Sequence, residues 1–376
     1  MTRADRFLFQ AIVPAIAAAA CESGGPQATP TDATDTVEDH AAADDADAPT
    51  DDGAGPTCEP LPGDYLPRVD GSAGDDWPPC VSDDNEYHRI EETITTIARV
   101  AQFEQIAALL WSGRVPSPDD FTEARVIYAT DQGLDSRVQR REDHHYPPVP
   151  AAEGTCRDPG VPARYPDRCA GPARILPILI DAFAAGMTGS DAPVNAARVE
   201  AALLWFLYLS VYKEAFTCTE TPRDCDSCWA YYTGGEARDA GLGLGRYVRR
   251  LDPATHDRVW DGILAVRCWK NLDNETGIST DATTRDRAIA QMDRALIRGV
   301  ALIVRERMQL AVALSGDASR AAWEFSRILG GALDREAAAH NPGIAEVLRS
   351  ALAAADPDEA DVSAAIAAID SLFSCP

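Results

Sequence analysis

Hydrophobic residues recur at helical spacing along most of this 376-residue chain. Ser117-Pro118-Asp119-Asp120 is typical of a helix cap and predicts a helix that ends at Tyr128. Before it, residues 86–111 carry apolar side chains three to five positions apart, as on one helix face: Ile90, Ile94, Ile97, Ala101, Ile106 and Leu110. Further helices are predicted over residues 173–187, 194–216, 229–232, 255–269, 283–314, 317–339, 343–355 and 361–372. No run alternates with period two, so the pattern predicts a single all-α, bundle-like domain over residues 85–376.

The helix predicted over residues 194–216 is the most hydrophobic. Residues 201–212 read AALLWFLYLSVY and are apolar nearly all round, which is typical of a central, buried helix. Glu214, at its end, shares a helix face with Leu203 and Leu207. A carboxylate there is solvated at the helix end, paired with an arginine, or a metal ligand. The sequence leaves these three interpretations open.

Acidic and aromatic residues follow this helix closely. In a structural interpretation, Asp226 caps a short helix that Gly234 terminates. In a functional interpretation, a tight turn brings the carboxylates at positions 224 and 226 to the end of the preceding helix. Hard oxygen donors of this kind suit iron, calcium or manganese better than zinc. The candidate ligands are Glu214, Asp224, Asp226, Tyr212 and Tyr231.

The same stretch resembles a known family. Tyr212-x-Glu214 and the segment DSCWAYYTGG at 226–235 are similar to the helix–turn–DEAWAFYTG core of the low-iron-inducible, iron-assimilating periplasmic proteins first known from green algae. Residues 124–128, 295–311 and 323–339 resemble further segments of that family more loosely. Ser227 stands where the family has an acidic residue. The resemblance implies an all-helical, non-catalytic protein that aids iron uptake outside the cell, with the family's core motif on the candidate ligands.

Residues 1–20 are typical of the leader peptide of an exported lipoprotein. Arg3 and Arg6 precede a mainly apolar run of fourteen residues, which is too short to span a bilayer. The sequence AAAC at 18–21 resembles a lipobox, so Cys21 is the expected lipidation site. The alternative is a plain signal peptide cleaved at the same place; either places the mature protein outside the cytoplasm. Glu22 after the anchor favours the outer membrane of a Gram-negative bacterium.

An acidic segment is predicted to link the anchor to the helical domain. Residues 22–57 contain ten Asp and Glu, no Lys or Arg and no aromatic residue, so they bury too little apolar surface to offset their ordering entropy. We therefore expect residues 21–84 to be a disordered, Pro-containing linker. The net charge of −26 makes nucleic acid a poor partner and favours metal cations or basic partners. Membrane contact is expected only through the lipid.

The cysteines predict a disulfide framework. Besides Cys21, the disulfide candidates are Cys58, Cys80, Cys156, Cys169, Cys218, Cys225, Cys228, Cys268 and Cys375. In an exported chain most of these cysteines form disulfides, and because their number is odd, one thiol remains. The pairs 58–80 and 156–169 are expected because their members lie close together in the sequence. The second pair would cross-link residues 133–172, an irregular stretch with seven prolines that we call the Pro-rich loop. A loop of this length is either functional or cross-linked. The CxxC at 225–228 lacks the strand of a redox motif, and a zinc site would recruit the cysteines at 218 and 268.

These features predict an extracytoplasmic, lipid-anchored protein that binds iron or assists iron assimilation and is not an enzyme. The rival prediction is a structural or interaction lipoprotein of the cell envelope with no metal, and its protein partner is not indicated. A weaker alternative is a hydrolase that uses Glu214 and Asp226 as a carboxylate pair. The chain has no GxSxG or Walker A motif, and the glycines of residues 240–245 follow no predicted strand.

Overall fold

The structure is a computed structural model that describes residues 59–68, 74–271 and 280–373, all within the unit Ala54–Pro376. Its α-helices are α1 (Thr96–Leu110), α2 (Pro118–Tyr128), α3 (Leu134–Val138), α4 (Val161–Arg164), α5 (Leu176–Met187), α6 (Ala192–Thr217), α7 (Arg223–Thr233), α8 (Gly243–Leu251), α9 (Pro253–Trp269), α10 (Ala282–Ala313), α11 (Gly316–Gly330), α12 (Asp334–His340), α13 (Pro342–Ala353) and α14 (Val362–Leu372). Short 3-10 or π turns are η1 (Ala151–Glu153), η2 (Gly171–Ile175), η3 (Arg238–Ala240), η4 (Gly331–Leu333) and η5 (Pro357–Glu359). No described residue lies in a β-strand, which confirms the predicted all-α class.

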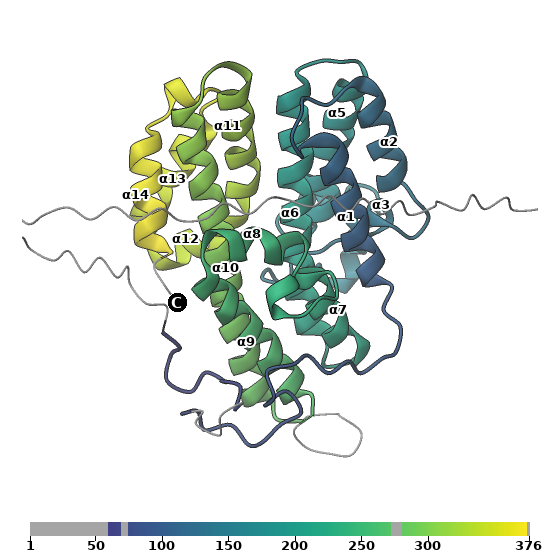
Figure 1. The fold of residues 1–376 in the computed structure, drawn as a ribbon, viewed down its shortest axis with the longest axis vertical. Helices are drawn as coiled ribbons and strands as arrows, with labels where there is room; N and C mark the ends of the chain where they lie inside the picture. Colours follow the sequence, from purple (N-terminus) through teal and green to yellow (C-terminus); the bar gives the residue numbers. More distant parts are fainter. Residues whose placement is uncertain (1–58, 69–73, 272–279, 374–376) are drawn as a thin grey trace, which may run out of the picture. The chain divides into compact units, whose positions relative to one another are not determined.

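The hydrophobic helix α6 lies at the centre of the fold (Figure 1). It packs against α5, α7 and α11, and it also contacts α1, α8 and α10. By length and composition α6 resembles a membrane span, but 89% of its most apolar 18-residue window is buried inside the protein. Such burial is expected of the core helix of a folded domain, because a helix that is apolar all round must be covered on every side.

Helices α9 and α10 pack along one another and extend the core away from α6. Gly262 on α9 allows this close approach, because a Cβ atom at that position would clash with the backbone of Met292 on α10. The other end of α10 contacts α11 and α14. The hydrophobic core therefore runs continuously from α6 through α10 to the C-terminal helices.

The predicted cap before α2 is confirmed. Ser117 Oγ accepts a hydrogen bond from the Asp120 amide (3.3 Å), and Asp120 Oδ2 accepts one from the Ser117 amide (2.7 Å). Together they form a capping box, and the helix ends at Tyr128 as expected.

Helix α1 begins ten residues later than residue 86, where the hydrophobic spacing predicts its start. The amides of Ile90 and Glu91 donate to the carboxylate of Asp226, at 2.9 and 2.8 Å, instead of to a preceding helical turn. The ring of Tyr87 stacks on that of Trp229, with centroids 4.8 Å apart. These tertiary contacts outweigh the helical pattern of residues 86–95.

Two other helix predictions are wrong for reasons of packing. The helix predicted over residues 317–339 is divided by the turn η4, whose flanking Gly330 lies against the side chain of Leu352. Helix α8 was not expected, because its first residues belong to a glycine-rich run. Gly245 is needed there, since a Cβ atom would lie 2.8 Å from the carbonyl oxygen of Tyr232.

The predicted linker ends too late. Tyr65 is fully buried, its amide donates to Gln291 Oε1 on α10 (2.8 Å), and Gln291 Nε2 donates back to its carbonyl oxygen (2.9 Å). Trp77 is also buried and packs edge-on against Tyr65. Residues 59–68 and 74–84 therefore belong to the helical domain. The leader, Cys21 and the remaining linker positions 21–58 and 69–73 lie outside the described residues.

Among the described residues, three cysteine pairs lie at disulfide distance, and only one of them was expected. The pair Cys156–Cys169 is confirmed, with Cα atoms 5.3 Å apart. The predicted pair 58–80 is wrong, because Cys80 pairs with Cys268 (Cα–Cα 5.4 Å) and anchors the segment before α1 to α9. The third pair is Cys218–Cys225 (Cα–Cα 5.0 Å). The two ends of the CxxC are thus not bonded to each other, and a zinc site using positions 218 and 268 is excluded. Cys228 is free and buried, whereas Cys58 and Cys375 lie outside the described residues.

Candidate functional site

Glu214 forms a buried ion pair at the end of α6. The residue is 7% exposed, and its Oε1 accepts hydrogen bonds from both Nη1 and Nη2 of Arg141, each at 3.4 Å. Lys213 Nζ donates to Oε2 at 2.9 Å. Burial raises the pKa of Glu214, but the charges of Arg141 and Lys213 outweigh it, so the pKa lies below its usual value. Of the three interpretations of Glu214, the structure shows the salt bridge to an arginine.

Asp224 belongs to the same network through Lys213. Its Oδ2 accepts hydrogen bonds from Lys213 Nζ (3.3 Å) and from the Thr217 hydroxyl (2.5 Å). Burial and the nearby charge of Glu214 raise the pKa of Asp224. Lys213 therefore lies between two carboxylates and occupies the position that a bridging cation would take.

Asp226 has different partners. It does not cap α7, whose first residue is Arg223, and its fully buried carboxylate is directed at the segment before α1. Its Oδ1 accepts hydrogen bonds from the Tyr87 hydroxyl (2.9 Å) and the Ile90 amide (3.0 Å), and its Oδ2 accepts from the Glu91 amide (2.8 Å). Burial raises the pKa of Asp226, although these hydrogen bonds oppose the effect. Gly234 does end α7, with φ of 74°, as expected.

The two candidate tyrosines have different partners. The hydroxyl of Tyr231 lies 3.5 Å from Nη2 of Arg141, whose guanidinium also lies over the Tyr231 and Phe206 rings. The ring of Tyr212 stacks on His145, with centroids 3.5 Å apart. Burial and the charge of Asp293 raise the pKa of Tyr212 to about 12. A phenolate ligand at Tyr212 is therefore disfavoured.

These five residues do not fit an iron ion. In the described parts of the chain, no three His, Cys, Asp or Glu side chains are grouped so that they could hold a metal. Arg141 and Lys213 neutralise the charges of Glu214 and Asp224. The carboxylate oxygens of Asp226 accept hydrogen bonds from the segment before α1. The expected convergence of the three carboxylates on one metal is not found.

A second buried polar cluster surrounds His145, which sequence reasoning passed over. Its Nδ1 hydrogen-bonds to Asp143 (2.6 Å) and its Nε2 to Asp293 on α10 (3.1 Å). Burial lowers the pKa of His145, but the two carboxylates more than offset this and raise it to about 9. The neighbouring His144 behaves in the opposite way, because burial and the charge of Arg168 lower its pKa to about 3. His145 is thus an imidazolium that ties the Pro-rich loop to α10.

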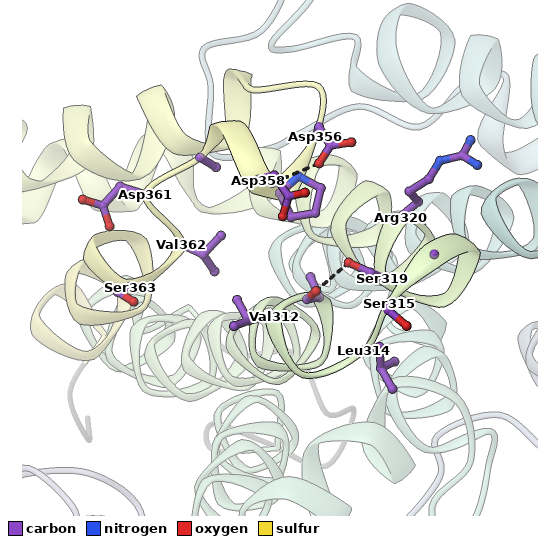
Figure 2. Close-up of a pocket in the computed structure, with 14 residues that line it drawn as sticks. Val312, Leu314, Ser315, Ser319, Arg320, Asp356, Asp358, Asp361, Val362 and Ser363 are labelled. Atoms are coloured by element: carbon purple, nitrogen blue, oxygen red, sulfur yellow. Dashed lines mark hydrogen bonds between the residues drawn. The ribbon is translucent and has the colours of Figure 1, made fainter.

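The described part of the chain also has surface cavities. One of about 520 Å³ lies between the end of α10, the start of α11 and the connection from α13 to α14 (Figure 2). Asp361 and Arg320 lie on opposite sides of it. Its charges are engaged within the fold, because Asp356 and Asp361 accept amide hydrogen bonds at helix starts and Arg320 pairs with Asp191 and Asp317.

A cavity of similar volume has a different character. It lies beside the Pro-rich loop, and its lining includes Ser136, Arg140, Arg157, Asp158 and Leu176. Sequence reasoning missed these arginines. The run RVQRR at 137–141 is visible in the sequence, but residues 246–250 read RYVRR with the same spacing, so the run alone does not single out a site.

Comparison with protein-family models, with curated proteins and with solved structures finds no match to this chain. The resemblance of residues 212–235 to the iron-assimilating proteins therefore rests on the sequence motif alone.

Proposed function

We propose that this protein is an exported, non-catalytic binding protein of the cell envelope that functions in an oxidising compartment. The observation that carries the proposal is the set of three cysteine pairs at disulfide distance in the part of the chain that the structure describes. They connect the segment before α1 to α9, close the Pro-rich loop, and join the end of α6 to α7. Disulfides of this structural kind persist in extracytoplasmic spaces and are rare in the cytosol. The leader-like residues 1–20 and the cysteine at 21 agree with export.

The contacts of the candidate carboxylates support a role other than catalysis. A general acid or base must reach its substrate with a free position on the carboxylate. Glu214 is held by Arg141 and Lys213, and Asp226 by the amides and hydroxyl of the segment before α1. The pair proposed for a hydrolase is therefore occupied by contacts that stabilise the fold.

Fractionation of the producing cells tests the proposal. We expect the wild-type protein in the membrane fraction, with a lipidated cysteine at position 21 as its N-terminus by mass spectrometry. Cys21→Ala should release the protein from membranes or mislocalise it, whereas the control Cys228→Ala, which removes the buried free thiol, should leave it anchored. A wild-type protein found in the cytoplasm with its leader intact would contradict export.

As a second candidate we propose a role in iron assimilation. The observation that favours it is that Tyr212-x-Glu214 and residues 226–235 lie on α6 and α7, which pack against one another as one unit. Iron titration of the wild type beside Glu214→Gln and Asp226→Asn tests this role. Because both carboxylates are held by contacts within the fold, we expect both variants to retain the iron affinity of the wild type; lost affinity in Glu214→Gln with an unchanged melting curve would instead assign iron binding to Glu214. Unchanged affinity with lowered stability would assign them to the fold, and no iron binding by the wild type would contradict the iron role.

A further inference from the structure

The cavity beside the Pro-rich loop has arginines in its wall and further arginines behind it. Arg140 and Arg157 belong to its lining of about 520 Å³. Arg137 on α3, Arg141 after it and Arg99 on α1 lie close enough to lower the pKa of Arg140 or Arg137 by charge repulsion. We call these five residues the arginine pocket.

Negative charge is scarce in the arginine pocket. Burial is the largest influence on the pKa of both Arg137 and Arg140 and lowers it, and neighbouring arginines lower it further. The strongest influences on the two pKa values include no carboxylate. Among the described residues, the ion pair of the cluster is that of Arg141 with Glu214, which Lys213 already shares. The pocket therefore carries excess positive charge within a strongly acidic protein.

The buried guanidinium groups are also short of hydrogen-bond acceptors. Arg99 is 4% exposed, and its nitrogens reach only the hydroxyls of Thr96 (3.2 Å) and Thr95 (3.4 Å). The Nε atoms of Arg99, Arg137 and Arg141 are buried with no hydrogen-bond partner. Some exposed arginines, by contrast, face a carboxylate with both nitrogens, as Arg250 does with Glu306 at 2.6 Å.

The wall of the arginine pocket is held in place by covalent and polar contacts. The disulfide Cys156–Cys169 closes the loop that carries Arg157. Asp158, the acidic residue in the lining, accepts hydrogen bonds from the amide (2.7 Å) and hydroxyl (3.0 Å) of Thr155. It therefore shapes the loop, and a ligand would find the pocket preorganised.

We infer that the arginine pocket binds a small multivalent oxyanion, either a phosphate or a polycarboxylate. Guanidinium groups bind such anions with paired, charge-assisted hydrogen bonds. Arg140 and Arg157 would contact the anion in the cavity, and the three arginines behind them would stabilise its charge through a medium of low polarity. The inference rests on the proposed function, since it gives that binding protein a ligand class.

Calorimetric titration of the full-length, oxidised protein with inorganic phosphate and with citrate tests the arginine pocket. We expect at least one of the two anions to bind, with sodium chloride at equal ionic strength unable to replace it. Arg140→Gln/Arg157→Gln should weaken binding roughly tenfold or more, because charged hydrogen bonds are lost. The matched control is Arg320→Gln, in the cavity of Figure 2, which should bind as the wild type does.

The comparison of the two anions identifies the ligand class: stronger phosphate binding indicates a phosphate group, and stronger citrate binding indicates a polycarboxylate. If the double variant unfolds, Arg157→Gln alone replaces it, because Arg157 is exposed. No binding of either anion, or equal weakening by Arg320→Gln, would overturn the inference. If the wild type then still carries its disulfides and lipid anchor, the proposed function stands without the pocket.

Discussion

At the scale of single residues, Asp226 joins segments that are far apart along the chain. Its two oxygens accept hydrogen bonds from Tyr87, Ile90 and Glu91, in the segment before α1. A buried carboxylate is tolerated when such donors surround it. The same donors leave no oxygen free for a metal, so one residue explains both the late start of α1 and the poor fit of iron.

Asp226→Asn should therefore destabilise the protein. Whichever oxygen is replaced, the new NH2 group faces an amide or hydroxyl donor, and a buried unsatisfied polar group costs about 1–3 kcal/mol. The free energy of unfolding, from urea melts, measures this loss. The control Asp239→Asn removes an exposed carboxylate and should change stability little. Equal stability of the two variants would show that the contacts of Asp226 are dispensable.

His145 should make stability depend on pH. Its pKa rises from 6.5 to about 9 on folding because of Asp293 and Asp143, despite its burial. The folded state thus holds the proton more tightly than the unfolded state. The resulting stabilisation, about 1–3 kcal/mol, is present in full below pH 6.5 and is lost as the pH rises to 9.

Unfolding free energies measured between pH 6 and roughly 9.5 test this dependence. The wild type should lose stability across this range, and His145→Gln should lose much less. The control His88→Gln removes a half-exposed histidine paired with Asp84 and should follow the wild type. Parallel pH profiles of the wild type and His145→Gln would contradict the assignment of an imidazolium to His145.

At the scale of elements, the ends of helices provide a matched pair of serines. Ser117 closes the capping box of α2, whereas Ser315, the residue before α11, makes no side-chain capping hydrogen bond. Ser117→Ala should lower the free energy of unfolding by about 0.5–2 kcal/mol, and Ser315→Ala should lower it by much less. Thermal melts of both variants measure the difference, and similar losses would show that the capping box adds nothing.

The hydrophobic pattern predicts most helices here because apolar spacing is a local property. Helices α2, α6, α9, α10 and α14 lie within a few residues of their expected bounds. The start of α1 and the glycine-rich helix α8 depend on the contacts of Asp226 and Gly245 with distant segments. Sequence spacing contains no information on such contacts.

The candidate site could be predicted only in part for the same reason. The pattern correctly placed Glu214 on a buried face, and an arginine partner was among its interpretations. The arginine that pairs with Glu214 is Arg141, which the Pro-rich loop brings to the end of α6. Lys213 also pairs with Glu214, so this carboxylate has no free position for a metal. The pairing of Cys80 with Cys268 likewise joins residues 188 positions apart, so the expectation that neighbouring cysteines pair was wrong for Cys80.

At the scale of the whole molecule, the disulfides should contribute unequally to stability. A cross-link limits the unfolded chain more when it closes a longer loop. Cys80–Cys268 spans 188 residues and Cys218–Cys225 spans 7. Replacing both cysteines of the long-range pair with alanine should therefore destabilise by about 2–3 kcal/mol more than replacing the short-range pair. Denaturant melts of the two double variants measure this, and an equal or reversed order would contradict it.

The central claim, that this protein functions in an oxidising compartment, is tested most directly by mapping its cysteines in the cells that make it. Thiols are trapped during lysis, and peptides are analysed without reduction. The account predicts the pairs Cys80–Cys268, Cys156–Cys169 and Cys218–Cys225, with Cys228 reacting as a thiol only after unfolding. Cys80 and Cys268 recovered as free thiols, or a bond between Cys225 and Cys228, would contradict it.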